Sequence, residues 1–186
     1  MKARWLFIFL TILFFGACKK ETLPKPKAML RLEYPNAAYE SFTTKCPYFF
    51  EKNSIAQAKN LKDCHVEITY SAMKATVHIT YMQIENNLDS LLRDAQKLTY
   101  EHVVKADAII EQPYINEEKK VYGMLYEIDG DAASQSQFYI TDSTTHFLTG
   151  ALYFYAKPNY DSILPAVAYL KKDIKKIIES MEWRKN

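Results

Sequence analysis

The sequence predicts an α+β fold, a three-layer α/β/α sandwich in which two long helices flank a mainly antiparallel sheet. Three observations predict it. The periodic segments occur in the order strands, helix, strands, helix. Neighbouring strands are joined by short polar turns, as in antiparallel hairpins. The later strands are apolar on both faces, and a sheet of such strands needs a layer on each side.

The first strands are short. Residues 30–34 predict a strand that ends at Pro35, and residues 48–50 predict a second one. Residues 53–63 predict a loop or a short helical turn that returns the chain to Cys64.

Two alternating runs, residues 65–70 and 75–82, predict a β-hairpin with Glu67 opposite His78. One face of this hairpin is apolar and holds Val66, Ile68, Tyr70, Ala75, Val77, Ile79 and Tyr81. The polar face holds His65, Glu67, Thr69, Thr76, His78 and Thr80. Two histidines and a carboxylate are potential metal ligands, but a solvated face with a cross-strand ion pair is the favoured interpretation. We expect no metal and no cofactor.

After this hairpin, Asn86 and Asn87 predict the start of a helix of about 18 residues. Its side chains at helical spacing form an apolar stripe of Leu88, Leu91, Leu92, Ala95, Leu98 and Val103. His102 borders this stripe, and we interpret it as a hydrogen-bonded packing residue.

Strands then resume. Residues 108–111 predict a strand that is cut by Pro113, and residues 120–128, 137–141 and 146–155 predict three more. The alternation of apolar and polar residues is largely lost in these later strands. We therefore expect the strands at the centre of the sheet, where both faces are covered.

The last helix is predicted to begin at Asn159 or Asp161 and to run to about Trp183, with Pro165 in its first turn. Its apolar stripe holds Ile163, Leu164, Val167, Leu170, Ile174, Ile177, Ile178 and Met181. The order helix, four strands, helix resembles the topology of the PsbP-like α/β/α sandwich.

The N-terminus predicts a bacterial lipoprotein signal. Lys2 and Arg4 precede an apolar run over residues 5–15, which is too short to span a bilayer as a helix. The small residues 16–17 then precede Cys18. Cleavage there places diacylglycerol on the Cys18 thiol and an acyl chain such as palmitate on its new amine. The alternative is an ordinary signal peptide in which Cys18 is incidental.

These signals divide the chain into a signal peptide (1–17), a lipidated tether (18–29) and a single globular domain (30–186). Pro24 and Pro26 favour an extended tether.

Two further cysteines, Cys46 and Cys64, lie in the predicted domain. In an exported protein such a pair more often forms a structural disulfide than a reactive site. Free thiols and a metal site are the alternatives. The metal site has weak support, because His65 is the only obvious additional ligand.

Charge and motifs argue for binding rather than catalysis. The chain has 24 Lys and Arg against 22 Asp and Glu, and Lys2 and Arg4 account for the excess, so nothing indicates a nucleic-acid partner. No hydrolase, phosphate-loop or metalloprotease motif occurs. Three close residues (Asp142, Ser143 and His146) suit a turn better than a catalytic triad, and three acids (Glu111, Glu117 and Glu118) form no isolated pair.

Aromatic residues are frequent, with 14 Tyr and 10 Phe. Most should build the core, but exposed ones make good contact anchors. The candidates are Tyr114, Tyr122, Tyr126, Tyr139, Tyr155 and Tyr160.

Four segments of the sequence resemble a known protein family. The segments LPKP, DAQKLTYEHVVKADAIIEQPY, KKVYGMLYEIDG and SQFYITDSTTHFLTGALYFYAKPNYDS closely resemble the GldD gliding-motility lipoprotein family of Bacteroidetes. The resemblance implies a membrane-anchored accessory component of gliding motility and the linked type IX secretion system, with Cys18 as the lipidation site. Its partners would be other envelope proteins of that apparatus. It implies no catalytic residue.

The anchor is expected to hold the domain in the periplasm, at the outer membrane. Surface-exported lipoproteins of this bacterial group typically carry an acidic run after the cysteine, which residues 19–22 lack. Inner-membrane retention follows an Asp in the second mature position, which is Lys19 here. A periplasmic small-ligand-binding protein or an unrecognised enzyme on the same fold remains the alternative function. A deep cleft with convergent titratable groups would favour it, whereas a flat, aromatic-rimmed surface would favour an assembly module.

Overall fold

A computed structural model describes residues 32–43, 45–155 and 160–184. The predicted signal peptide and most of the tether, including Cys18, lie outside the described residues. The described strands (β), α-helices (α) and 3-10 helices (η) are, in order, β1 (Tyr39–Thr43), β2 (Tyr48–Asn53), β3 (Gln57–Asn60), η2 (Lys62–Cys64), β4 (Val66–Tyr70), η3 (Ser71–Met73), β5 (Ala75–Gln83), α2 (Leu88–Tyr100), η4 (Glu101–Val104), β6 (Ala106–Asn116), β7 (Val121–Gly130), β8 (Ser134–Thr141), β9 (His146–Phe154), α3 (Tyr160–Ser180) and β10 (Glu182–Trp183).

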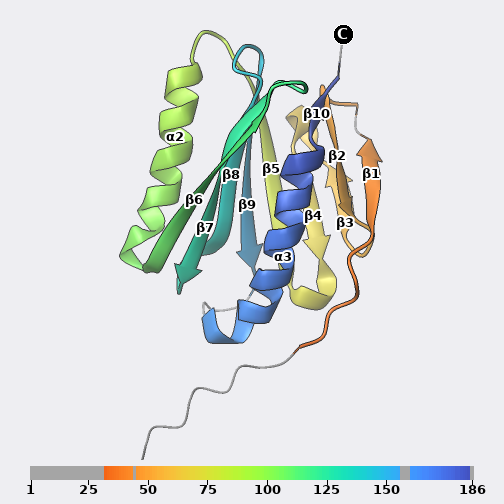
Figure 1. The fold of residues 1–186 in the computed structure, drawn as a ribbon, viewed down its shortest axis with the longest axis vertical. Helices are drawn as coiled ribbons and strands as arrows, with labels where there is room; N and C mark the ends of the chain where they lie inside the picture. Colours follow the sequence, from red (N-terminus) through yellow and green to blue (C-terminus); the bar gives the residue numbers. More distant parts are fainter. Residues whose placement is uncertain (1–31, 44, 156–159, 185–186) are drawn as a thin grey trace, which may run out of the picture.

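The strands form two sheets, and all their pairings are antiparallel (Figure 1). The large sheet has the order β3-β4-β5-β9-β8-β7-β6, and the small sheet has the order β1-β2-β10. The predicted α+β class with a mainly antiparallel sheet and two helices is therefore confirmed. The small sheet was not predicted, and it pairs the beginning of the domain with its end.

Helix α3 lies over one face of the large sheet and carries most of the core (Figure 1). Its apolar stripe is buried together with side chains of β2, β4, β5, β8 and β9. The predicted stripe is confirmed over its middle and end, where Val167, Leu170, Ile174, Ile177, Ile178 and Met181 are all buried. The helix ends at Ser180, before the predicted Trp183, because residues 182–183 pair with β2 instead. Pro165 lies beyond the first turn, inside the helix.

Helix α2 contacts β8 of the large sheet through the Thr99 hydroxyl. Along β8, Gln137 and Tyr139 line a groove under α2, whereas the alternate side chain Ile140 belongs to the core shared with α3. The helix begins after Asn87, as predicted, but gives way to η4 after Tyr100 and is shorter than expected. The side chains of His102 and Val103 lie outside the described part.

Several strand predictions are confirmed and others are wrong. The hairpin of β4 and β5 has Glu67 opposite His78, as predicted, although Thr76 on its polar face is fully buried. Residues 32–34 form no strand, and the first described strand is β1. The predicted loop over residues 53–63 contains β3 and part of η2.

The strand predicted to end at Pro113 instead runs through it, from residue 106 to residue 116. This is physically allowed because β6 is the last strand of its sheet, where a residue without an N–H need not break a ladder on both sides.

Candidate functional site: the α2–β6 surface

Exposed apolar side chains concentrate on three consecutive elements, α2, η4 and β6, which we call the α2–β6 surface. Five of its large apolar residues are exposed: Leu98 (46 %), Tyr100 (48 %), Val104 (89 %), Ile110 (48 %) and Ile115 (69 %). The other large apolar residues that are exposed in the described part of the chain are Leu32, Ile55, Leu61 and Tyr155. Side chains of this kind make strong contacts when a partner covers them.

Helix α2 has the right periodicity to bury an apolar stripe but buries little of it. Leu88, Leu91, Leu92 and Ala95 are only half-buried, and Thr99 is the one fully buried residue of the helix. The Thr99 hydroxyl donates to Oε1 of Gln137 on β8, at 2.8 Å. This polar contact fixes the C-terminal end of α2 on the sheet.

Aromatic rings continue from that end of α2 across the sheet. Tyr100 meets the Tyr126 ring edge-on, with centroids 6.5 Å apart, and its hydroxyl donates to the Glu111 carboxylate on β6. The Tyr139 ring is 6.4 Å from that of Tyr126 and stacks on Phe147 at 5.8 Å. The row of rings therefore joins an exposed tyrosine to the buried part of this face.

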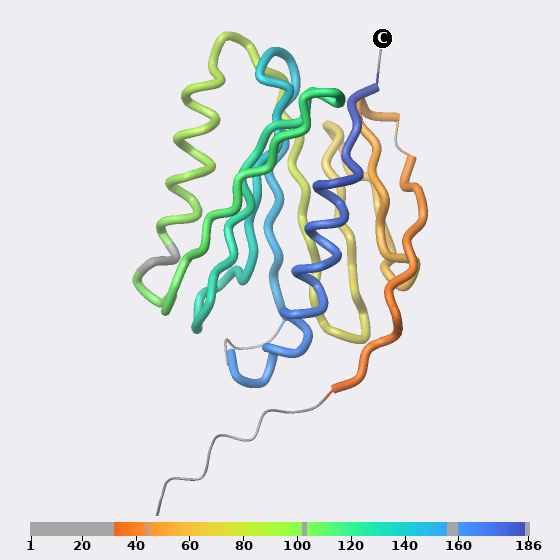
Figure 2. The backbone as a smooth tube through the Cα atoms, viewed as in Figure 1, coloured from red at the N-terminus to blue at the C-terminus, as the bar shows by residue number. Residues whose placement is uncertain are grey.

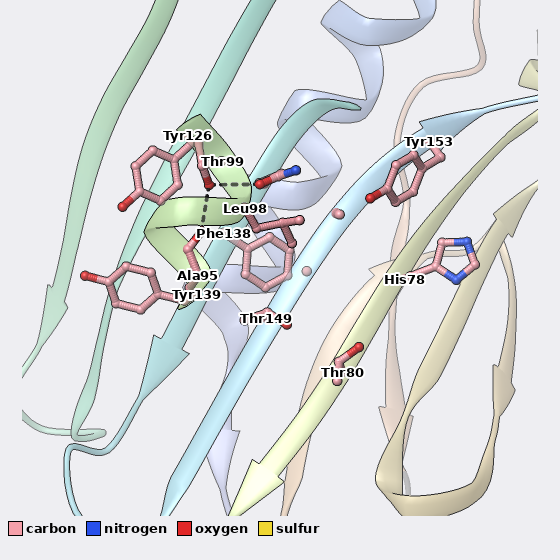
Figure 3. A pocket seen from close by; sticks show the side chains of 13 residues that line it. His78, Thr80, Ala95, Leu98, Thr99, Tyr126, Phe138, Tyr139, Thr149 and Tyr153 are labelled. Carbon is pink, nitrogen blue, oxygen red and sulfur yellow. Dashed lines mark hydrogen bonds between the residues drawn. The ribbon is translucent and has the colours of Figure 1, made fainter. Parts of the chain in front are cut away.

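A groove of about 140 Å³ lies between α2 and strands β5, β7, β8 and β9 (Figure 3). Ala95 and Leu98 line it from the helix, and Tyr139, Tyr153 and His78 line it from the sheet. Sites for small organic ligands usually occupy about 300–1,000 Å³. This groove is closer to the size of one buried ring or aliphatic side chain. The groove is therefore smaller than the deep cleft that would favour a small-ligand-binding protein or an enzyme.

Strand β6 is an edge strand, and it is the longest strand of the described fold. Its pairing with β7 extends from Ala106 to Asn116, with one irregularity between Ala106 and Ala108. The sequence prediction missed this edge because Pro113 was interpreted as the end of a strand. A proline within an otherwise regular strand pattern is itself a signal for an edge position.

A second, open groove of about 540 Å³ lies where the β6–β7 turn, the β8–β9 turn and β10 meet. His146 is central to it, since its Nδ1 is 2.9 Å from the Tyr81 hydroxyl and its ring stacks on Trp183 at 5.2 Å. Lys119 and Glu182 form an ion pair of 2.7 Å on its wall.

The arrangement of Asp142, Ser143 and His146 is that of a turn, as predicted. Oδ1 of Asp142 accepts the backbone N–H groups of residues 144, 145 and 146 at 2.8–3.0 Å. Burial alone would raise the pKa of Asp142, but these three donors outweigh it and hold the pKa below its ordinary value. The Ser143 N–H donates to Oγ1 of Thr141 at 2.9 Å, which is a further contact of the same turn.

A buried carboxylate, Asp173, lies on the inner side of α3. Tyr39 and Asn53 each donate to it at 2.9 Å, and Asn53 also donates to the Tyr169 hydroxyl. Burial raises the pKa of Tyr70, and the nearby charge of Asp173 raises it further. The Tyr70 hydroxyl does not have the geometry of a hydrogen bond to Asp173. Burial raises the pKa of Asp173, and the donors offset this only in part. These hydrogen bonds join α3 to β1 and β2.

Cys46 and Cys64 form a disulfide, with Cα atoms 5.5 Å apart. The bond joins the segment just before β2 to η2, and the Tyr48 hydroxyl donates to the Cys64 carbonyl at 2.6 Å. Within the described residues no group of three or more His, Cys, Asp or Glu side chains is placed to hold a metal. Nδ1 of His78 is 3.5 Å from Glu67, whereas His65 accepts the Tyr81 N–H instead.

The three acids of the sequence analysis do not lie together. Glu111 lies in β6, whereas Glu117 and Glu118 lie in the β6–β7 turn. Of the six tyrosines predicted as possible anchors, only Tyr155 is exposed. Tyr100 is the exposed tyrosine of the α2–β6 surface. Its place outside the apolar stripe of the predicted helix was the available signal.

Fold and surface together define a mainly antiparallel α+β domain with a disulfide and one long sheet edge that no other strand of the described residues covers. The family described as Gliding motility lipoprotein GldD matches residues 19–183, and the chain belongs to this family. It is thus a lipoprotein related to gliding motility, which implies a lipid-anchored place in the cell envelope. No curated protein matches the chain. Of the helices in the described ranges, none combines the length and the apolar character that crossing a membrane requires.

Proposed function

We propose that this protein is an accessory assembly module of the gliding and type IX secretion machinery, which holds an envelope protein on its α2–β6 surface. The observation that carries the proposal is the exposure of Leu98, Tyr100, Val104, Ile110 and Ile115 on consecutive elements. Such exposure is unfavourable for an isolated domain and is explained when a partner covers it.

The module acts through binding rather than catalysis. The acid and histidine side chains closest to a catalytic arrangement are engaged in turn and cross-strand contacts. The groove under α2 suits one inserted side chain of a protein better than a free small molecule, because of its volume of about 140 Å³. In this proposal the two helices and the large sheet are the three layers of an α/β/α sandwich, and the partner contacts the domain along the side formed by α2, η4 and the edge strand β6.

Anchoring is part of the proposal. Cys18 carries the lipid and residues 18–29 hold the domain in the periplasm, at the outer membrane. Cys18→Ala should release the protein from the membrane fraction or leave an uncleaved precursor. Protease added to intact cells should spare the domain and digest it once the outer membrane is opened. A mature Cys18→Ala protein in the membrane fraction, or digestion in intact cells, would contradict this placement.

The docking role is tested by charge substitution in a gliding bacterium whose own copy is replaced. Leu98→Asp and Ile115→Asp should abolish spreading while the protein keeps its amount and melting temperature. Leu61→Asp is the matched control, because Leu61 is also an exposed aliphatic residue (38 %) but lies between β3 and β4. Normal gliding of both surface variants, at wild-type protein levels, would reject the α2–β6 surface as the docking site.

A further inference from the structure

We propose that β6 accepts a β-strand: an extended segment of an envelope protein adds to its free edge and continues the large sheet. This deepens the proposed function and rests on it, since it states how the partner is held. The backbone N–H and C=O groups along an edge strand that face away from the sheet are unpaired, and strand addition is a common way to recognise an extended peptide.

The edges of the two sheets differ in how well they are protected. Natural proteins protect edges by keeping them short or by placing lysine or proline on them. At the other edge of the large sheet, β3 has four residues and contains Lys59. The edge strands of the small sheet, β1 and β10, have five and two residues. Strand β6 has 11 residues and neither lysine nor arginine, and its protective features are Pro113 and the irregularity between Ala106 and Ala108 at its beginning.

The exposed side chains of β6 suit an added strand. Ile110 and Ile115 point to opposite faces of the sheet, because an odd number of positions separates them in an unbroken register with β7. Both are about half exposed or more, at 48 % and 69 %. A neighbouring strand would place side chains roughly 5 Å from each of them and cover both faces of the edge at once. A partner that contacted a single face would leave one of the two isoleucines in water.

A second copy of this chain does not fit the edge. Strand β6 begins at the pole where the first described residues lie and ends at the opposite pole (Figure 2). Antiparallel pairing of two β6 edges would place the first described residues of the two copies at opposite poles. Pairing of two identical β6 edges in either direction would also join two strands whose charged residues, Asp107 and Glu111, are all acidic. The occupant is therefore a strand from a different protein.

Charge defines the chemistry of that strand. Asp107 and Glu111 are the only charged residues of β6. The accepted segment should therefore carry a lysine or arginine opposite Glu111 and β-branched apolar residues beside Ile110 and Ile115, with no proline.

The test uses the domain with its disulfide intact and three synthetic peptides. The first alternates valine and threonine around a central arginine, the second has glutamate in place of the arginine, and the third has a proline at its centre. Amide hydrogen exchange is followed by NMR. Excess of the first peptide should slow exchange at alternate residues of 108–115 by about tenfold or more, because new backbone hydrogen bonds protect those amides. The second should protect less, and the third not at all.

Variants make the outcome specific to the edge. Ile110→Lys and Ile115→Lys should each remove the protection, whereas Ile55→Lys, at an exposed aliphatic residue outside β6, should leave it unchanged. Strand addition is wrong if no amide of β6 is protected by saturating first peptide, or if protection appears at every residue rather than alternate ones. If that happens while Leu98→Asp still abolishes gliding, the docking surface stands and only its mode is rejected. Protection by the peptide together with normal gliding of Ile115→Lys would instead reject the docking role of this edge in the cell.

Discussion

The two α-helices of this domain have similar sequence patterns and very different surroundings. Both are amphipathic, and both lie on the large sheet. Helix α3 buries Ala166, Val167, Leu170, Asp173, Ile174, Ile177 and Ile178, whereas α2 buries only Thr99. The pattern of apolar residues therefore predicts which side of a helix faces inward, but it does not predict how completely that side is covered.

The polar contacts of the two helices with the strands also differ. Lys171 of α3 lies 3.1 Å from Glu127 and 3.0 Å from Asp129 on β7, and Lys176 lies 2.6 Å from Glu51 on β2. The α2 side is joined to the sheet by the Thr99 and Tyr100 hydroxyls. Regions with few buried apolar contacts open at lower free energy than the rest of a protein. The α3 side thus supplies stability, and the α2 side is free to carry the binding surface.

The largest test of this contrast truncates one leucine on each helix. Leu170→Ala on α3 should lower the free energy of unfolding by about 2–5 kcal/mol, because it removes a fully buried side chain and leaves a cavity. Leu98→Ala on α2 should lower it by about 0.5 kcal/mol or less, since that side chain is 46 % exposed. Urea unfolding followed by circular dichroism measures both. Equal losses would show that α2 is as tightly packed as α3.

The disulfide is expected to have a comparable effect on the α3 side. It joins the segment just before β2 of the small sheet to η2, which leads into β4 of the large one. Replacing Cys46 and Cys64 together by alanine should cost about 2–5 kcal/mol, because the unfolded chain regains the freedom of the closed loop. The same urea titration with and without reductant checks this, and the double variant should no longer respond to reductant. A wild-type protein with two alkylatable thiols in its folded, non-reduced state would contradict the bond.

The sequence predicted the α3 side better than the α2 side, for physical reasons. The residues of β4, β5 and α3 repeat regularly and are buried as a set, so periodicity alone locates them. The small sheet was missed because β1 has only five residues, mostly exposed, and because β10 follows directly on a helix. Its existence depends on contacts between the two ends of the domain, which local pattern does not contain.

The candidate site was harder to predict than the core. Nothing in residues 106–116 states that the strand has a neighbour on one side only, although Pro113 is consistent with it. Apolar residues such as Leu98 and Ile110 are normally expected to be buried, so residue type does not predict their exposure. This exposure becomes visible only when the whole sheet is assembled. The disulfide, in contrast, was inferred from residue type and export alone.

A smaller effect distinguishes two neighbouring positions within a single strand. In β9, a Cβ on Gly150 would overlap the ring of Phe138, which is 3 % exposed in the core. Gly150→Ala should therefore destabilise by about 1–3 kcal/mol through overpacking. The neighbouring Ala151 lines the groove under α2, and Ala151→Ser should change stability by about 0.5 kcal/mol or less. Thermal unfolding of the two variants compares them, and an equal shift in melting temperature would mean that Ala151 has no more room for an added atom than Gly150 has.

The smallest expected effect is a dependence on pH that arises from Asp173 on α3. Burial raises the pKa of this carboxyl above its ordinary value of 3.8 in the folded state. The folded protein therefore binds this proton more tightly than the unfolded chain does. The contribution of Asp173 to stability is largest below the unfolded pKa and decreases as pH rises through the folded pKa.

Asp173→Asn cannot titrate, so it isolates this contribution. The variant loses one acceptor for Tyr39 or Asn53 and should be less stable at every pH. Its deficit relative to wild type should nevertheless shrink as pH rises from about 4 to about 7, because only the wild type must ionise a buried group. Urea unfolding of both proteins across this range measures the difference. A deficit that grows with pH would show that the ionised carboxylate is the form that the fold prefers, and that the donors on β1 and β2 outweigh the burial of Asp173.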